Sequence, residues 1–240
     1  MRKYGFTLAE VLVTLGIIGI ITSLALPTFT ADTHNRANAS KLASVVADYE
    51  NVFGMMLVKE DKMDLIDTEF GTAVAANNDT GIKQALSKYV KMGRAGNTIS
   101  DLGYSSGMKN IRNGAETLTF TEGINTNTGA SVFIYADNST RTESAAVTAG
   151  AGCATKTATV YIDVNGSAVP NKYGRDIFGF VLGGDGLLYP YGSLTASFLN
   201  NESSNPIWSG SNTTYGCQTG EYLGLGCTAR LIENNYKMDY

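Results

Sequence analysis

The first quarter of the chain contains two successive patterns of apolar positions. Residues 6–26 are apolar almost without interruption and carry a single charge, Glu10. Because about 20 apolar residues are enough to cross a bilayer as a helix, we predict a membrane-spanning helix over residues 6–26. Further along, apolar residues return at the spacing of one helix face; they are Leu42, Val45, Val46, Tyr49, Val52, Phe53 and Met56. We therefore expect an amphipathic continuation over residues 27–58 that packs on a globular head, with a helix that Pro27 kinks or interrupts but does not end.

The remaining sequence, residues 59–240, is rich in Gly, Thr, Ser and Asn and is predicted to form the globular head. Its pattern predicts one helix at residues 81–92, a turn-rich stretch at 122–129, and strands at 117–121, 131–136, 158–164, 176–182 and 187–189. Residues 145–154 and 200–214 are of low complexity and are predicted to be surface loops. Strands that follow one long helix favour an α+β fold, with the helix packed on an antiparallel sheet.

Composition narrows the classes of function. The 240 residues carry a net charge of −4 and a single histidine, His34. The negative charge excludes a nucleic-acid-binding protein that works by bulk positive charge, so no nucleic-acid partner is expected. One histidine excludes a zinc site with several His ligands, and a Ser-His-Asp or Cys-His catalytic arrangement would depend on it. We expect His34 to be a solvated or interface residue and the chain not to be an enzyme.

The flanks of the apolar segment set its orientation. Arg2 and Lys3 precede it and should stay on the cytoplasmic side, so that the head lies outside. A simple signal anchor, or a secretory signal peptide with Ser23-Leu24-Ala25 as its cleavage site, would share this pattern. Glu10 argues against both, because a carboxylate near the membrane centre costs about 2.5–3.5 kcal/mol and indicates a function that involves a partner group.

The run from Gly5 to Glu10, GFTLAE, resembles the processing site of type IV prepilins and type II secretion pseudopilins. These precursors have a short basic leader that ends in Gly, then Phe, a Glu five residues into the mature chain, and an unbroken apolar helix. The resemblance implies a leader peptide of residues 1–5, which a prepilin peptidase removes by cleavage after Gly5 before it methylates the new amine of Phe6. It also implies a structural subunit with a pilin-like fold and no required cofactor.

By the same resemblance, the precursor lies in the lipid of the cytoplasmic (inner) membrane as a single-pass protein with its head outside. Assembly machinery in that membrane would then extract it into a periplasmic or cell-surface filament, made of copies of itself and of other pilin-like subunits. Cleavage would place a positive amine on Phe6, within reach of Glu10 of a neighbouring subunit. That pairing would remove the cost of an isolated carboxylate in lipid and set the stagger of the subunits.

Two questions stay open at this level. The filament could be a type IV pilus, a type II secretion pseudopilus or a DNA-uptake pilus. The alternative to a filament subunit is a secreted or membrane-anchored globular protein, either a binding protein or a hydrolase, whose N-terminus is an ordinary signal sequence.

Three cysteines, Cys153, Cys217 and Cys227, lie in the outward part of the chain, where an oxidising compartment permits disulfides. Three cysteines allow three different single bonds. The spacing of Cys217 and Cys227 among glycines resembles the C-terminal disulfide loop of many pilins, and this resemblance implies a bond between them. The pairing of Cys153 stays open.

Asp163, Asn165 and Asp176 form a candidate calcium site, because their side-chain oxygens are the ligand type that Ca²⁺ prefers. Some pseudopilins that resemble this chain bind calcium in a loop of the head. The segment is not an EF-hand, since its twelfth loop position is Gly174 and not Glu. The alternative is a tight turn in which Asp163 and Asn165 bond local backbone groups.

Overall fold

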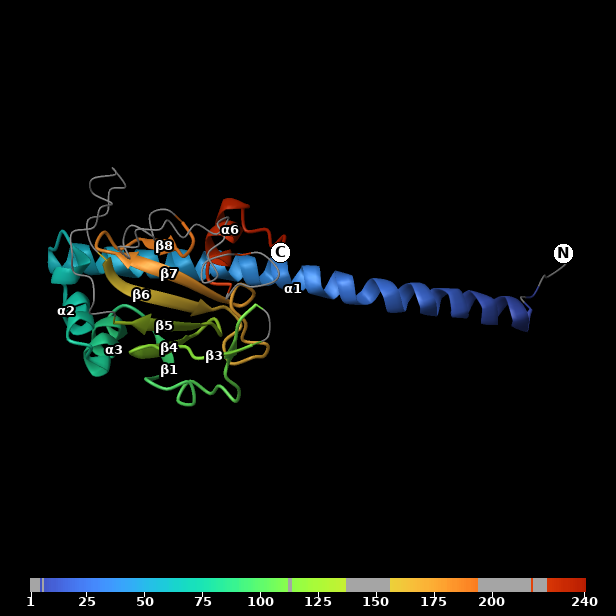
Figure 1. Cartoon of the computed structure of the whole chain (residues 1–240), viewed down its shortest axis with the longest axis horizontal. Coiled ribbons are helices and arrows are strands. Elements are labelled where there is room, and N and C mark those ends of the chain that lie inside the picture. The colour runs from blue at the N-terminus through green and yellow to red at the C-terminus, as the bar shows by residue number, and fades with distance from the viewer. Residues whose placement is uncertain (1–4, 6, 112–113, 137–155, 194–216, 218–223) are drawn as a thin grey trace.

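The computed structural model describes residues 5, 7–111, 114–136, 156–193, 217 and 224–240, and only the backbone over residues 24–32. Phe6, Cys153, most of the predicted leader and the predicted loops at 145–154 and 200–214 therefore lie outside the described residues. Figure 1 shows a globular head from which one long helix projects toward the N-terminus.

The long helix, α1, spans Leu8–Glu60 and continues through Pro27. Its 53 residues correspond to a length of roughly 80 Å. It begins after Thr7, whose side chain caps the first turn, and ends at Glu60, directly before Asp61, which adopts a left-handed backbone conformation with φ of 53°. The helix is long enough for one half to pack on the head while the other half extends beyond it.

The C-terminal half of α1 forms the centre of the core. The residues that the apolar periodicity marks are all buried: Leu42, Val45, Val46, Tyr49, Val52, Phe53 and Met56. Phe53 is fully buried, and its ring centroid lies 6.1 Å from that of Tyr49 and 5.4 Å from that of Phe70. Each such side chain contributes about 1.5–3 kcal/mol when it is removed from water. The predicted amphipathic face is confirmed.

The head contains a six-stranded antiparallel sheet with the strand order β1-β4-β5-β6-β7-β8. The strands are β1 (Met92–Gly96), β4 (Glu122–Thr126), β5 (Ser131–Tyr135), β6 (Lys156–Asp163), β7 (Ile177–Gly183) and β8 (Leu188–Pro190). A separate pair is formed by β2 (Met108–Lys109) and β3 (Ala115–Glu116). The short helices are η1 (Leu65–Asp67), α2 (Glu69–Ala75), α3 (Asp79–Ser87) and α6 (Cys227–Glu233). The predicted α+β fold, a long helix packed on a domain with an antiparallel sheet, is confirmed.

Strand β6 lies inside the sheet and is covered on both faces. Because successive side chains of a strand point to opposite faces, Ala158, Val160 and Ile162 pack with α1 in the main core. On the other face, the Tyr161 ring lies 6.3 Å from the rings of Tyr173 and Tyr191. The sheet therefore has one core against α1 and smaller apolar clusters on its outer face.

Two of the predicted elements are misplaced. The strand predicted at 117–121 is wrong, and β4 instead occupies the first part of the predicted turn at 122–129. The turn is confined to the residues around Gly129, whose φ is 76°. Ile124, within the range predicted as turn, instead pairs with Val132 of β5 as part of the hairpin. The helix predicted at 81–92 begins earlier and ends at Ser87, because Met92 pairs with Thr126 as part of β1.

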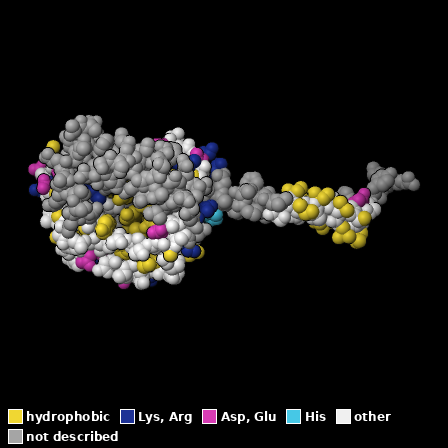
Figure 2. Space-filling model, in the orientation of Figure 1, with side chains coloured by type: hydrophobic (Ala, Val, Ile, Leu, Met, Phe, Trp, Pro, Cys, Tyr) yellow, Lys and Arg dark blue, Asp and Glu magenta, His cyan; other side chains and the backbone are white. Residues whose placement is uncertain are grey.

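The N-terminal half of α1 exposes large apolar side chains, which Figure 2 shows on the projecting helix. They are Leu8, Val11, Leu12, Val13, Leu15, Ile17, Ile18, Ile20 and Ile21. Within the described residues, no helix has an apolar stretch that is long enough to cross a membrane. The membrane-spanning helix at residues 6–26 stays a prediction.

Candidate functional site

The first turn of α1 is closed by a capping box between Thr7 and Glu10. The Glu10 Oε2 atom accepts hydrogen bonds from the Thr7 backbone N–H at 2.8 Å and from the Thr7 hydroxyl at 2.9 Å. The Glu10 N–H donates in return to the Thr7 Oγ1 atom at 3.3 Å. This arrangement holds the carboxylate at the start of the helix, directly after the predicted cleavage bond, where the partial positive charge of the helix also favours an anion.

Thr7 is the residue of this site that sequence reasoning missed. The pattern Thr-x-x-Glu before an apolar run is the sequence signature of a capping box, and it is present at Thr7 and Glu10. The signature gives Glu10 a partner on its own chain, in addition to the neighbouring amine that the apolar surroundings predict. The site is therefore a pair of residues and not an isolated carboxylate.

Beyond this turn, the exposed side chains surround α1 instead of forming one stripe. Leu12, Val13 and Leu15 point in different directions around the helix, and each is 61% exposed. At Gly16 and Gly19, a Cβ atom would meet no other atom within 4 Å. Small residues of this kind let a second helix approach closely. An apolar surface of this extent needs lipid or other chains to cover it.

At the C-terminal side of the head, Cys217 and Cys227 form a disulfide, and both residues are fully buried. Closing a loop of this length stabilises the folded state by about 2–3 kcal/mol in the chain-entropy model. Arg230 of α6 donates a hydrogen bond to the Cys217 carbonyl at 2.6 Å. A Cβ atom at Gly174 would lie 2.9 Å from the Cys227 side chain, so the loop between β6 and β7 packs directly on the disulfide.

The structure brings Asp163, Asn165 and Asp176 together in the same loop. The Asn165 side chain donates to the Asp176 Oδ2 atom at 3.2 Å, and the Asn165 N–H donates to the Asp163 Oδ1 atom at 3.1 Å. The Tyr104 hydroxyl donates to Asp163 at 2.7 Å, and the Lys172 N–H donates to Asp176. Both carboxyl groups are buried, and burial raises the pKa of each of them.

These contacts have the form of the tight turn, since protein donors occupy the carboxylate oxygens of Asp163 and Asp176. Among the described residues, no three Asp, Glu, His or Cys side chains are grouped so that they could hold a metal ion. Calcium binding stays a prediction, and a thermal-shift measurement of the full chain with millimolar Ca²⁺ would test it.

Glu122 is a buried carboxyl group that the sequence did not mark. It is 3% exposed, and its Oε1 atom has no hydrogen-bond partner. It lies at a surface pocket of about 470 Å³ whose other charged residues are Asp79, Lys83, Arg94 and Asp101. Burial raises the pKa of Glu122 to about 7, because it outweighs the attraction of Lys83. The sequence does not reveal this burial, because the residues around Glu122 come from α3, β1 and the loop after β1, which lie far from it in the chain.

The raised pKa of Glu122 predicts a pH dependence of stability. The folded state binds the proton more tightly than the unfolded chain, whose Glu pKa is about 4.3, so stability should fall as the pH rises from about 4.5 through 7. Glu122→Gln should remove this fall in stability. The melting temperature of the variant, minus that of the wild type, should therefore be higher at pH 8 than at pH 5. Melting curves of both chains at the two pH values measure the effect, with Glu116→Gln as the matched control. An equal difference between wild type and Glu122→Gln at both pH values would contradict the prediction.

Comparison with known proteins bears on the N-terminal site. Residues 1–26 match the family model of the prokaryotic N-terminal methylation motif. This is the prepilin-type motif of type IV pilins and pseudopilins, and the match includes Gly5, Phe6, Thr7 and Glu10. Searches of curated proteins and of solved structures gave no match.

The motif supports a precursor of the pilin or pseudopilin type, and it points to a structural subunit and not to an enzyme. It implies processing by a prepilin peptidase and assembly with other pilin subunits. It also indicates a membrane-anchored precursor and an extracellular or periplasmic filament.

Proposed function

We propose that the chain is a structural subunit of a type IV pilus or a type II secretion pseudopilus. In this proposal, a prepilin peptidase cuts after Gly5 and methylates Phe6, and the mature chain polymerises through α1. The observation that carries the proposal is the methylation motif at residues 1–26. The exposed apolar half of α1 supports it, because that surface needs lipid before assembly and neighbouring helices afterwards.

In this proposal, each successive segment of the chain has its own role. Residues 1–5 are removed, and residues 6–26 lie first in the lipid of the inner membrane and then in the filament core. Residues 27–58 connect this segment to the head, residues 59–240, which stays outside the membrane. Assembly machinery of the inner membrane would move each subunit from lipid into the filament.

Glu10 has the central role in the proposed assembly step. Cleavage after Gly5 creates a positively charged amine on Phe6, and in lipid this amine and the Glu10 carboxylate are both costly unless they are paired. The capping box with Thr7 keeps the carboxylate at the start of the helix in the single chain. An amine from a neighbouring subunit would meet it there, which would determine how far adjacent subunits are offset.

Mass spectrometry of the mature N-terminus tests this function. The chain is produced in cells with and without a prepilin peptidase and purified from the membrane fraction. We expect the chain from cells with the peptidase to begin at N-methylated Phe6, and the chain from cells without the peptidase to retain Met1. A mature chain that begins at Leu26 would support the alternative, a secreted protein with an ordinary signal sequence, and would overturn the proposal.

A further inference from the structure

The end of the head from which the apolar half of α1 projects carries a group of basic side chains. Lys109, Lys172 and Arg175, here called the proximal basic cluster, come from β2 and from the loop between β6 and β7. Lys109 and Lys172 pair through their backbones in a short parallel bridge. The Arg175 carbonyl accepts a hydrogen bond from the Asn38 side chain of α1 at 3.4 Å, which places the cluster beside the helix. Figure 2 shows Lys and Arg side chains gathered where the helix leaves the head.

Local carboxylates offset the positive charges of this cluster only in part. Within the described part of the chain, none of its three side chains forms an ion pair. Burial lowers the pKa of Lys172, and the positive charges of Arg175 and Lys109 lower it further, while the Asp176 carboxylate acts in the opposite direction. Asp176 is buried in its loop, where it accepts hydrogen bonds from the Asn165 side chain and the Lys172 N–H, and Glu116 accepts a hydrogen bond from Asn110.

More basic side chains lie at the same end. Lys237 and Arg36 line a hollow of about 380 Å³ between the C-terminal segment and α1. Both residues are exposed. Basic side chains therefore line this hollow as well, and Asp239 of the same C-terminal segment is paired with Arg230.

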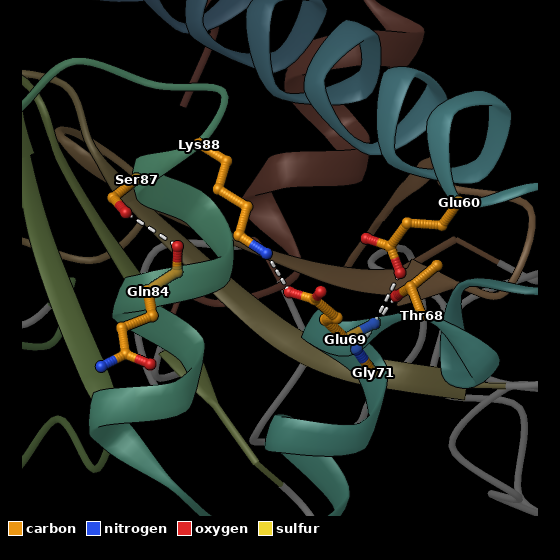
Figure 3. A network of polar contacts seen from close by, with 7 residues as sticks. All are labelled: Glu60, Thr68, Glu69, Gly71, Gln84, Ser87 and Lys88. Atoms are coloured by element: carbon orange, nitrogen blue, oxygen red, sulfur yellow. Dashed lines mark hydrogen bonds and ion pairs between the residues drawn. The ribbon is translucent and has the colours of Figure 1, made fainter.

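The opposite end of the head is acidic. Glu60, Asp61 and Asp67, here called the distal acidic cluster, lie where α1 ends and in η1. Asp61 and Asp67 are exposed, and Glu60 accepts a hydrogen bond from the Glu69 N–H at 2.7 Å, as Figure 3 shows. Glu60 and Asp67 also line a hollow of about 520 Å³ over α2 and α3. The positive charge of Lys88 is taken up there by an ion pair with Glu69.

Other charged residues do not reverse the sign of this end. Lys59 lies over the Tyr89 ring, with its ammonium group 5.0 Å from the ring centroid. Lys62 is exposed next to Asp61. Two further acidic residues lie at this end, Asp64 and Asp185. Asp64 precedes η1, and Asp185 is next to Gly184, whose carbonyl accepts a hydrogen bond from the Leu65 N–H. Carboxylates therefore outnumber ammonium groups at the distal end.

We propose that the proximal basic cluster of one copy docks on the distal acidic cluster of a copy further along the filament, and not of the adjacent copy whose Phe6 amine pairs with Glu10. The inference rests on the proposed polymerisation and names the head surfaces that take part in it. Asn38, which marks the basic end, and Glu60, at the acidic end, are 22 positions apart on α1, which corresponds to roughly 33 Å. A contact between two different patches at opposite ends of a subunit leaves one of each patch free, so it propagates as an open filament. Complementary charges would also fix the direction of stacking, because reversed subunits would bring like charges together.

Anionic lipid headgroups are the competing partner for a basic surface near a membrane. Asn38 lies 12 positions beyond Leu26, the predicted end of the membrane segment, which is about 18 Å along the helix. The headgroup layer adds only about 5–8 Å on each side of the hydrocarbon core, and charges are screened over about 8 Å at physiological salt. The cluster therefore lies beyond the effective reach of the headgroups, which favours a second copy as the partner.

A charge-reversal experiment with rescue tests this docking. The full chain is expressed in cells that contain its peptidase and assembly machinery, and filaments sheared from the cells are quantified against total chain by immunoblot. The variants are Lys109→Glu with Lys172→Glu and Arg175→Glu, then Glu60→Lys with Asp61→Lys and Asp67→Lys, and then all six together. Each triple variant should lower the filament yield at least about tenfold through like-charge repulsion, and the sixfold variant should recover most of it.

The control is Lys91→Glu with Asn127→Glu, which adds negative charge at exposed positions on the β1 side of the head, outside the Glu122 pocket, and should keep most of the yield. Melting temperatures of the purified chains show that each variant is folded, and recovery in the sixfold variant shows the same for both sets of substitutions. Triple variants with the wild-type yield, or folded variants without recovery, overturn the docking alone. Normal filaments combined with lost binding to phosphatidylglycerol vesicles would instead assign the basic cluster to the membrane. A wild-type chain that forms no filament overturns both this inference and the proposed function.

Discussion

Glu10→Leu should leave the chain inserted in the membrane and processed at its N-terminus, but should lower its recovery in filaments at least about tenfold. Insertion should not suffer, because the change removes a carboxylate that costs about 2.5–3.5 kcal/mol near the membrane centre. Assembly should fail because the amine of the neighbouring Phe6 would be buried without its partner, and removing one member of a buried ion pair costs about 3–5 kcal/mol. Sheared filaments and membrane fractions, quantified separately, distinguish the two steps.

Thr7→Val is the matched control for Glu10→Leu. It removes the hydroxyl that donates to Glu10 Oε2 at 2.9 Å but keeps the carboxylate and the Thr7 backbone donor. Loss of a side-chain cap costs about 1 kcal/mol, so filament recovery should fall much less than it does for Glu10→Leu. Wild-type incorporation of Glu10→Leu would exclude the proposed pairing, and an equal loss in both variants would assign the role of Glu10 to the capping box alone.

Phe53→Ala should lower the free energy of unfolding by about 3–5 kcal/mol, the range for deleting a fully buried aromatic side chain. Phe53 has no exposed surface, and its ring lies between those of Tyr49 and Phe70, which come from α1 and α2. The cavity would therefore open between the long helix and the rest of the head. Denaturant unfolding of the full chain in detergent, followed by circular dichroism, measures the change.

The control for Phe53→Ala lies two positions further along α1. Met55 is 42% exposed, and a substitution at such a position changes stability by about 0.5 kcal/mol or less. Met55→Ala should therefore unfold close to the wild type. Equal losses for the two variants would contradict the packing of this face of α1 on the head.

Elements whose signal is local were predictable from the sequence. The two patterns of α1 are continuous along the chain, and the strands β6 and β7 are runs of apolar and β-branched residues whose predicted ranges overlap the observed ones. In contrast, β1 and β4 contain glycines and polar residues and have little strand propensity of their own. They become strands because β5 lies next to β4, with Ile124 opposite Val132, and β4 in turn pairs with β1.

The candidate sites divide in the same way. Gly5, Phe6 and Glu10 could be named without a structure, because leader, cleavage position and apolar helix are consecutive in the chain and a peptidase would read them in that form. The partner of Glu10 within its own chain was also present in the sequence as a capping signature at Thr7. Asp163 and Asp176 could be named as oxygen ligands, but only the fold shows that Tyr104 and the Lys172 N–H already bond them.

The order of residues alone was thus sufficient to predict the N-terminal segment and the face of α1 that packs on the head, because both features depend on residues that are only a few positions apart. Tertiary structure was needed for the buried charge of Glu122 and for the opposite charges at the two ends of the head. Lys109 meets Lys172 and Arg175 only after β2 has paired with the distant loop between β6 and β7, and the acidic cluster of Glu60 and Asp67 faces away from them because α1 separates the two ends of the head. Charge at a surface depends on which distant segments the fold brings together, and this information is spread over the whole chain instead of any single stretch.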